Sequence, residues 1–299
     1  ESRFDEQLVN FDTSTFYFHW PDQYDEVMTK ASELEQQHGR DGGRATAYNY
    51  SDANGSSVPP DVTLADLKNL KRRGGRVVAV PQAPMKFHPK FDTAIRSIML
   101  GDPAAHLVLL CDPSKPSQLV WRARLLARLT TAEIAGTATN GAANDWVRTR
   151  VHFLPRISPI EFLELCREST VVLDPFPFGG GVTSLEAFAV CAPVVTAPAL
   201  QTVPGLTAGM YAQMGLREGG SDAEDEAGEG GGAAAPVAST VRGYARRALW
   251  LLRNATAQAQ LRASICEVRH RLYENATAVE EWAAFLERVS GVASIRSGL

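Results

Sequence analysis

Long hydrophobic runs, closely spaced cysteines and an excess of either charge are all absent from this chain of 299 residues. No apolar run approaches the roughly 18 residues that a membrane-spanning helix requires, and the longest runs have the length of a strand. The cysteines show no C-x-x-C spacing, so we expect apolar packing in a reducing compartment, with neither a metal site nor a disulfide framework. They are Cys111, Cys166, Cys191 and Cys266.

The charge balance argues against a nucleic-acid surface. The chain has 30 basic and 34 acidic residues, a net charge of −4, and no basic stripe recurs along an expected helix. Its 44% hydrophobic and 21% charged residues are typical of a globular protein, and its length suits one large domain or two modest ones. The sequence opens with Glu1 and nothing like a signal peptide follows, so we interpret it as a piece of a longer protein.

Short apolar segments alternate with amphipathic stretches of helical length from Arg76 onward. Strands are expected at residues 76–80, 106–111, 151–154, 170–173 and 193–196, and helices at 89–100, 116–129, 159–168 and 183–190. Near-continuous apolar strands separated by helices indicate a sheet that is buried on both faces. The sequence therefore predicts an α/β fold, with a Rossmann-like parallel sheet and helices on both of its faces.

The two flanks of this alternation differ from it. Residues 1–63 include a Gly-, Ser-, Asn- and Pro-rich stretch and are expected to form a lead-in segment and linker, followed by one domain over residues 64–299. Residues 217–235 contain six glycines and six acidic residues against one arginine, which predicts a disordered insertion. The last sixty residues are expected to be helical. One apolar face would hold Leu261, Ile265, Val268 and Leu272, and another Val279, Trp282, Leu286 and Val289.

The most informative motif is V-V-L-D-P-F-P-F-G-G-G-V-T-S-L-E-A, residues 171–187. It is typical of a buried strand, a proline-containing loop, a glycine turn and a helix that begins near Val182. Glycines let backbone N–H groups approach an anion, and the first N–H groups of a helix lack intrahelical partners, so a diphosphate suits this turn. The expected ligand contacts are Gly180, Gly181, Val182, the hydroxyls of Thr183 and Ser184, and Glu186 as an acceptor for a sugar hydroxyl.

A simpler interpretation of the same motif stays open: a tight turn in which glycine serves geometry and Glu186 complements the helix dipole. The motif matches neither G-x-G-x-x-G nor G-x-x-x-x-G-K-[ST], which disfavours dinucleotide enzymes and P-loop NTPases.

A second motif, V-P-Q-A-P-M-K-F-H-P, follows the first expected strand at residues 80–89. Ligands of open α/β sheets bind outside the carboxyl ends of strands. Lys86 would place a charge on a phosphate and stabilise a departing nucleoside diphosphate, while Gln82 would supply an amide donor. The alternative is a solvated Lys86. For His88 we favour a cap on the next helix over a role in binding.

A third motif, R-V-H-F-L-P-R-I-S-P-I-E-F, spans residues 150–162. It predicts a strand, a loop and a helix capped by Ser158. Backbone groups of Arg156 and Ile157 would lie free at the carboxyl end of this strand, where they suit the edge of a base. Phe162 offers a face for stacking, although core packing is its more ordinary role.

Taken together, these segments resemble the C-terminal catalytic lobe of the O-GlcNAc transferase family, which includes bacterial relatives and an O-fucosyltransferase branch. The likeness rests on residues 81–92, 150–158 and 174–187, and continues in P-V-V-T-A-P (193–198) and T-A-G-M-Y-A-Q-M-G-L (207–216). The segment E-Q-L-V-N-F-D (6–12) looks like the part that joins the two lobes of that family. The resemblance implies a GT-B glycosyltransferase fold, of which this chain is the donor-binding half.

By this resemblance Lys86 and Gln82 face the diphosphate, Glu186 binds the ribose and the Ile157 backbone reads the base. The implied reaction transfers GlcNAc from UDP-GlcNAc to protein Ser or Thr hydroxyls, with neither a metal nor a cofactor. The implied partners are the nucleotide sugar, a protein acceptor, an N-terminal catalytic lobe and tetratricopeptide repeats, with no nucleic acid or membrane. A cytoplasmic or nucleocytoplasmic location is expected.

Three features depart from the family pattern. Val182 stands where many relatives carry Thr or His, and Pro159 where some carry a ribose-contacting Lys. The first lobe with its active-site His has no counterpart in this sequence, so we expect the chain alone to be inactive. Two alternatives stay open: a GDP-fucose donor, and a non-catalytic module that binds nucleotide sugars.

Overall fold

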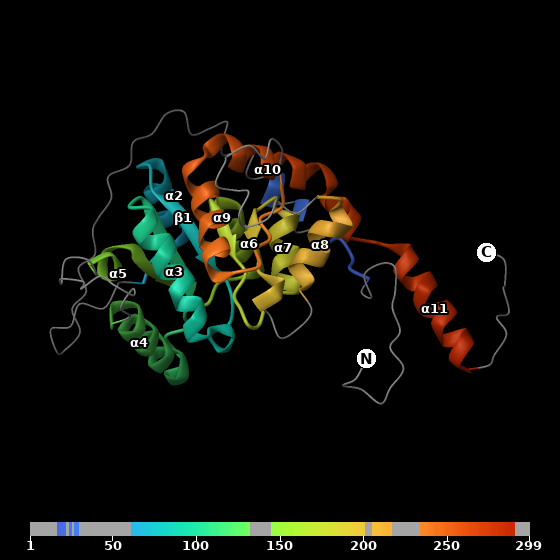
Figure 1. Ribbon diagram of the computed structural model, residues 1–299, viewed down its shortest axis with the longest axis horizontal. Coiled ribbons are helices and arrows are strands. Elements are labelled where there is room, and N and C mark those ends of the chain that lie inside the picture. Colours follow the sequence, from blue (N-terminus) through green and yellow to red (C-terminus); the bar gives the residue numbers. More distant parts are fainter. Residues whose placement is uncertain are drawn as a thin grey trace.

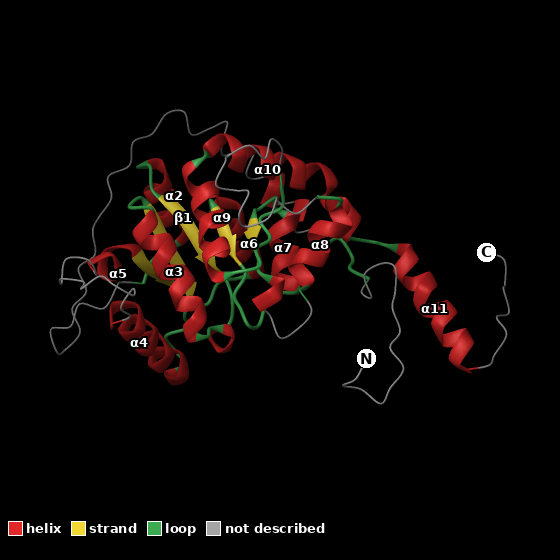
Figure 2. Ribbon diagram, in the orientation of Figure 1, coloured by secondary structure: helices red, strands yellow, loops and turns green. Residues whose placement is uncertain are grey.

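The computed structural model describes residues 17–21, 24–25, 27–29, 61–131, 145–200, 205–216 and 234–290. Most of the expected lead-in segment (1–63) and of the expected disordered insertion (217–235) lies outside these residues, as do residues 6–12. Figures 1 and 2 show a central sheet surrounded by helices.

The five strands are β1 (Arg76–Val80), β2 (Ala105–Leu110), β3 (Val151–Leu154), β4 (Val171–Leu173) and β5 (Val194–Val195). The α-helices are α2 (Leu64–Arg72), α3 (Pro89–Gly101), α4 (Pro116–Thr131), α5 (Asp145–Arg150), α6 (Pro159–Glu168), α7 (Val182–Ala189), α8 (Leu206–Met214), α9 (Val241–Arg253), α10 (Ala255–Val268) and α11 (Ala276–Ser290). Short 3₁₀ turns are η1 (Pro84–Lys86), η3 (Pro198–Leu200) and η5 (Arg269–Leu272). The expected strands and helices are confirmed to within about two residues, and α2, α5 and α8 are additions.

The sheet is parallel throughout, with the strand order β3-β2-β1-β4-β5. From β1 the chain adds β2 and β3 on one side, then crosses to place β4 on the other side of β1. The connections that follow β1 and β4 therefore diverge. Their common point, at the carboxyl ends of β1 and β4, is the position at which open α/β sheets bind ligands.

Alternation along the strands divides the core between the two faces of the sheet. Val78 and Val80 point to one face, where they join the larger core cluster with residues of α3 and α9. Val77 and Ala79 point to the other, where a smaller cluster includes Leu67 of α2. Burial on both faces explains why these strands are apolar almost without interruption.

Two helices begin at the capping residues that the sequence indicates. His88 caps α3, and its Nδ1 accepts a hydrogen bond from the backbone N–H of Lys90 at 3.1 Å, which confirms the capping interpretation. Ser158 and Glu161 form a reciprocal capping box at the start of α6. These caps fix where the loops after β1 and β3 end.

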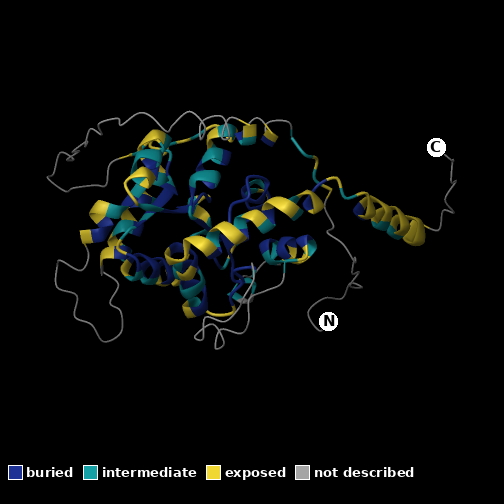
Figure 3. Ribbon diagram, turned by 90° about the horizontal axis from the view of Figure 1, so that it is seen from above, coloured by how far each residue is buried: buried dark blue, intermediate teal, exposed yellow. Residues whose placement is uncertain are grey.

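The C-terminal region is helical, as expected. Leu261, Ile265 and Leu272 are buried, whereas the apolar stripe of α11 is exposed, with Leu286 at 55% and Val289 at 60%. Figures 1 and 3 show α11 extending away from the body with most of its surface exposed. Among the described helices, none combines the length and apolar character needed to cross a bilayer.

The expectation that all four cysteines pack as apolar residues is wrong for two of them. Cys191 and Cys266 form a disulfide, with their Cα atoms 5.0 Å apart across 75 residues of sequence. Cys191 has a φ of 61°, and this left-handed turn redirects the chain after α7. Spacing in the sequence gave no sign of the pairing because the fold creates it. Cys111 and Cys166 are free and buried.

Candidate functional site

The loops after β1 and β4 meet at the topological switch point of the sheet. Nζ of Lys86 donates to the carbonyl oxygen of Gly179 at 3.0 Å, and Nε2 of Gln82 donates to Oγ1 of Thr183 at 2.5 Å. Phe87 forms an isolated bridge to Pro177. The structure thus brings together two motifs that lie about 90 residues apart in sequence.

Lys86 points at the glycine turn and is held there by neutral groups. Besides Gly179, its ammonium donates to Oε1 of Gln82 at 2.8 Å and lies 5.2 Å from the centre of the Phe178 ring. Burial lowers the pKa of Lys86 below its ordinary value of 10.5, and the nearby charge of Asp174 partly opposes this change. The position is therefore fixed before any ligand arrives.

Side chains of neighbouring residues pack closely against Gly180 of the glycine turn. A Cβ at Gly180 would lie 2.3 Å from Oγ of Ser184 and 2.8 Å from Nε2 of Gln82. Gly181 precedes α7, whose first residues are Val182 and Thr183. The first N–H groups of this helix have no intrahelical acceptor and carry the positive end of its dipole.

Asp174 is an organiser of the turn that the sequence analysis missed. It is buried directly after β4, where Oδ1 accepts from the N–H of Gly180 at 2.5 Å and Oδ2 accepts from Oγ1 of Thr196 at 2.7 Å. Its carbonyl oxygen accepts from the hydroxyl of Tyr244 at 2.9 Å. An aspartate between an apolar strand and a proline was the available signal.

Two further predicted contacts, Ser184 and Glu186, follow the turn on α7. Ser184 is buried, and its Oγ accepts from Oγ1 of Thr207 at 2.8 Å, so it supports α8. Glu186 is half-buried on α7, and desolvation raises its pKa. Burial raises the pKa values of Tyr24 and Tyr273, and the charge of Glu186 adds to both increases. The sequence did not single out these two aromatic residues.

A cleft of about 330 Å³ opens beside Gln82 and Thr183, at the carboxyl ends of β1, β2 and β3. Arg156, Ile157 and Phe162 line it, which brings the third motif to the same place as the other two. The remaining lining includes Pro81, Leu110, Cys111, Asp112, Lys115 and Gln118. Among the described residues, no group of three or more His, Cys, Asp or Glu side chains is placed to hold a metal ion.

Solved structures share this fold. A mutant O-GlcNAc transferase from Thermobaculum terrenum matches with a TM-score of 0.53 and 22% identity, over 72% of this chain and 36% of that one. The chain has the fold of a GT-B glycosyltransferase lobe. The UDP-forming α,α-trehalose-phosphate synthase of Burkholderia xenovorans matches with a TM-score of 0.51 and 15% identity, over 93% of this chain and 52% of that one. The α,α-trehalose-phosphate synthase of Burkholderia vietnamiensis matches with a TM-score of 0.51 and 13% identity, over 91% of this chain and 52% of that one.

The resemblance noted in the sequence is thereby confirmed at the level of the fold. No model of a protein family and no curated protein matches the chain. The chain spans 36% to 52% of the length of the three solved structures named above.

Proposed function

We propose that this GT-B lobe binds the donor of a glycosyltransferase, transferring GlcNAc from UDP-GlcNAc to protein Ser or Thr hydroxyls when an N-terminal lobe completes it. The observation that supports the proposal best is the convergence of Lys86 on the glycine turn at the switch point of the sheet. A cation, a helix N-terminus and a cleft for a base then lie in one place, as a nucleoside diphosphate requires.

The chemistry follows from the charge of the leaving group. As the sugar departs, negative charge grows on the diphosphate, and a cation fixed in advance stabilises it without reorganisation. The ammonium of Lys86 donates to an amide oxygen and a carbonyl oxygen, both of them weaker acceptors than a phosphate. The N–H groups of Val182 and Thr183 would hold the phosphate from the other side.

The cleft would receive the nucleoside. In this proposal backbone groups of Ile157 contact the base and Phe162 offers a stacking face, and both residues line the cleft. Glu186, which is not among the lining residues, would accept a ribose hydroxyl from α7. Desolvation raises the pKa of Glu186, and a hydroxyl donor would stabilise its carboxylate. The proposal assigns no metal and no cofactor to the reaction.

A non-catalytic module that binds nucleotide sugars is the second candidate. It is favoured by Val182, which is 58% exposed at the first position of α7 and has no hydroxyl to offer a phosphate. Binding with no transfer by the full-length protein would select this candidate.

The test compares Lys86→Ala with Lys90→Ala in the full-length protein. Lys90 lies exposed in the first turn of α3, so its loss controls for charge alone. We expect Lys86→Ala to lower the transfer rate about 100- to 1000-fold and to weaken UDP binding, while Lys90→Ala leaves both unchanged. Equal rates in the two variants would contradict the proposal. A competition of UDP against GDP, measured by calorimetry, decides between UDP-GlcNAc and GDP-fucose as the donor.

A further inference from the structure

The two bonded cysteines differ in their surroundings. Cys191 follows α7 and is 3% exposed, whereas Cys266 lies in the last turn of α10 and is exposed. An external thiol can therefore reach one sulfur of the pair and not the other. Accessibility decides which sulfur of a disulfide is attacked.

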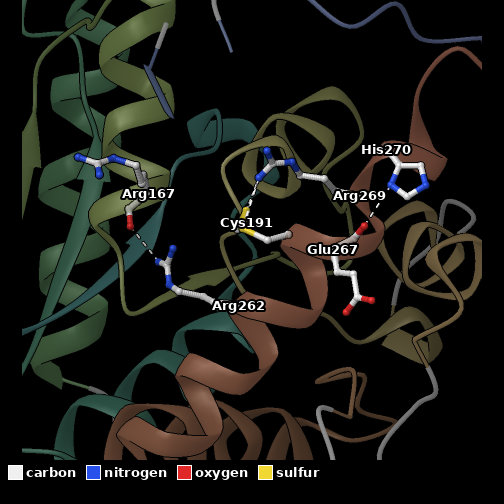
Figure 4. The surroundings of a disulfide bond; sticks show 7 residues. Arg167, Cys191, Arg262, Glu267, Arg269 and His270 are labelled. Atoms are coloured by element: carbon white, nitrogen blue, oxygen red, sulfur yellow. Dashed lines mark hydrogen bonds between the residues drawn. A yellow bond between two sulfur atoms is a disulfide. The ribbon is translucent and has the colours of Figure 1, made fainter. Parts of the chain in front are cut away.

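A single guanidinium lies against both sulfurs. Nη1 of Arg269 contacts Sγ of Cys191 most closely and is 3.4 Å from Sγ of Cys266. The guanidinium is also placed 5.5 Å from the centre of the Trp20 ring. Figure 4 shows Arg269 reaching Cys191, while the carboxylate of Glu267 points away from it. A fixed cation beside a sulfur stabilises its thiolate.

We propose that the Cys191–Cys266 bond is a site of reversible thiol–disulfide exchange, at which a small thiol such as glutathione joins Cys266 and expels Cys191. The exposed sulfur is the point of attack, and the buried sulfur is the leaving group that Arg269 stabilises. This assignment does not depend on the proposed transfer of sugar.

The thiolate of glutathione attacks Sγ of Cys266, a new S–S bond forms there and the bond to Cys191 breaks. The electron pair stays on Sγ of Cys191, which leaves as a thiolate beside Arg269 and takes up a proton from solvent. A second glutathione thiolate attacks the glutathione sulfur of the mixed disulfide, which yields free Cys266 and glutathione disulfide. Two glutathione molecules are oxidised and one protein disulfide is reduced.

The remaining two cysteines have the opposite character. Burial raises the pKa values of both Cys111 and Cys166, and both side chains are buried. They are expected to stay unmodified under the same conditions and serve as internal controls.

Peptide mass spectrometry after an acid quench locates the mixed disulfide. We expect the glutathione adduct on Cys266 at early times, with Cys191 free, and the same adduct on Cys266 when Cys191→Ser is treated with glutathione disulfide. A first adduct on Cys191 would overturn the proposal. If the purified protein instead holds four free thiols, excess glutathione disulfide must form the bond through an adduct on Cys266, and failure to do so would equally overturn it.

The role of the guanidinium is tested with Arg269→Gln against Arg271→Gln. Arg271 lies on the same turn but donates to the carbonyl oxygen of Met214, so its loss removes a charge without touching the sulfurs. We expect Arg269→Gln to slow the appearance of the adduct about three- to tenfold and Arg271→Gln to leave it unchanged. Equal rates in both variants would remove Arg269 from the mechanism.

Discussion

Two polar networks lie at opposite edges of the same sheet, and they differ in how their positive charges are matched. At the amino edge, Nη1 of Arg76 donates to both carboxylate oxygens of Asp102, at 2.6 and 2.7 Å. Arg150 donates there to three carbonyl oxygens, at 2.9 to 3.1 Å. At the carboxyl edge, Nζ of Lys86 donates to two neutral oxygens, and the nearby charge of Asp174 also acts on it.

The difference separates structural charge from charge that suits a ligand. A buried cation matched by a carboxylate or by several carbonyls holds segments together, and removing one partner leaves the other exposed to a large desolvation cost. A cation held by weak neutral partners next to a helix N-terminus and a cleft can exchange those partners for an anion. Substitutions at the amino edge should therefore affect stability alone, and substitutions at the carboxyl edge should affect binding.

The largest effect is expected for Asp102→Ala. Asp102 is 2% exposed and accepts hydrogen bonds from Arg76 and from the backbone N–H of Ala104 at 3.0 Å. Its removal leaves both donors unmatched and should lower the free energy of unfolding by about 3 kcal/mol. Urea denaturation measures the loss. UDP affinity of the folded fraction should stay at the wild-type value, and a parallel fall in affinity would break the division.

Gly180→Ala is expected to act mainly on binding and to weaken the binding of UDP by about 1 to 3 kcal/mol. The new Cβ displaces Ser184 and Gln82, so the turn and the amide next to Lys86 both shift. The matched control is Gly209→Ala, because a Cβ there meets nothing within 4 Å and lies on α8. Calorimetry with UDP should show weaker binding in the first variant only. Unaltered binding to Gly180→Ala would place the diphosphate elsewhere.

The sequence predicted much of this fold because its signals are local. The apolar strands, the proline at the start of α3 and the Ser158 capping box are each visible within a few residues. The glycine turn and Lys86 were also visible, since both follow buried strands directly. Parallel strands bring their carboxyl ends to one edge, so their meeting was predictable in outline.

What the sequence could not show depends on contacts across the fold. Asp174 organises the turn through Thr196 and Tyr244, which lie 22 and 70 residues away. The bond between Cys191 and Cys266 needs α7 and α10 to lie side by side. The bond that Oγ of Ser184 accepts from Thr207 of α8 likewise joins residues far apart in sequence, and the predicted contact of Ser184 with a ligand stays a prediction.

Stability is expected to depend on pH through a histidine pair on β2 and β3. Nδ1 of His106 and Nε2 of His152 are 2.9 Å apart, and burial lowers the pKa of each from 6.5 to about 4. The unfolded chain then binds more protons than the folded one between these values, so stability falls as the pH drops from 6.5 towards 4. We expect this pair to account for about 1 kcal/mol of the loss, after allowance for solvent screening of the partly exposed His106 ring.

Thermal unfolding across this pH range measures the effect, and His152→Gln should flatten the dependence. UDP affinity of the folded protein should not follow the same curve, because neither ring lines the cleft. If His152→Gln removed the pH dependence of UDP affinity as well as that of stability, the histidine pair would be coupled to the binding site, and the separation of the two regions would be wrong.

The smallest effect is expected for Val182→Thr, which sharpens the assignment of the carboxyl edge. Val182 is 58% exposed at the start of α7, so a hydroxyl placed there meets no packing constraint. If a phosphate lies at this helix N-terminus, the added donor should tighten UDP binding by about 0.5 to 1 kcal/mol. Val182→Ala removes both methyl groups without adding a donor and should produce no gain. Uridine, which has no phosphate, should bind both variants equally, and a matching gain for uridine would mean that the hydroxyl faces the nucleoside.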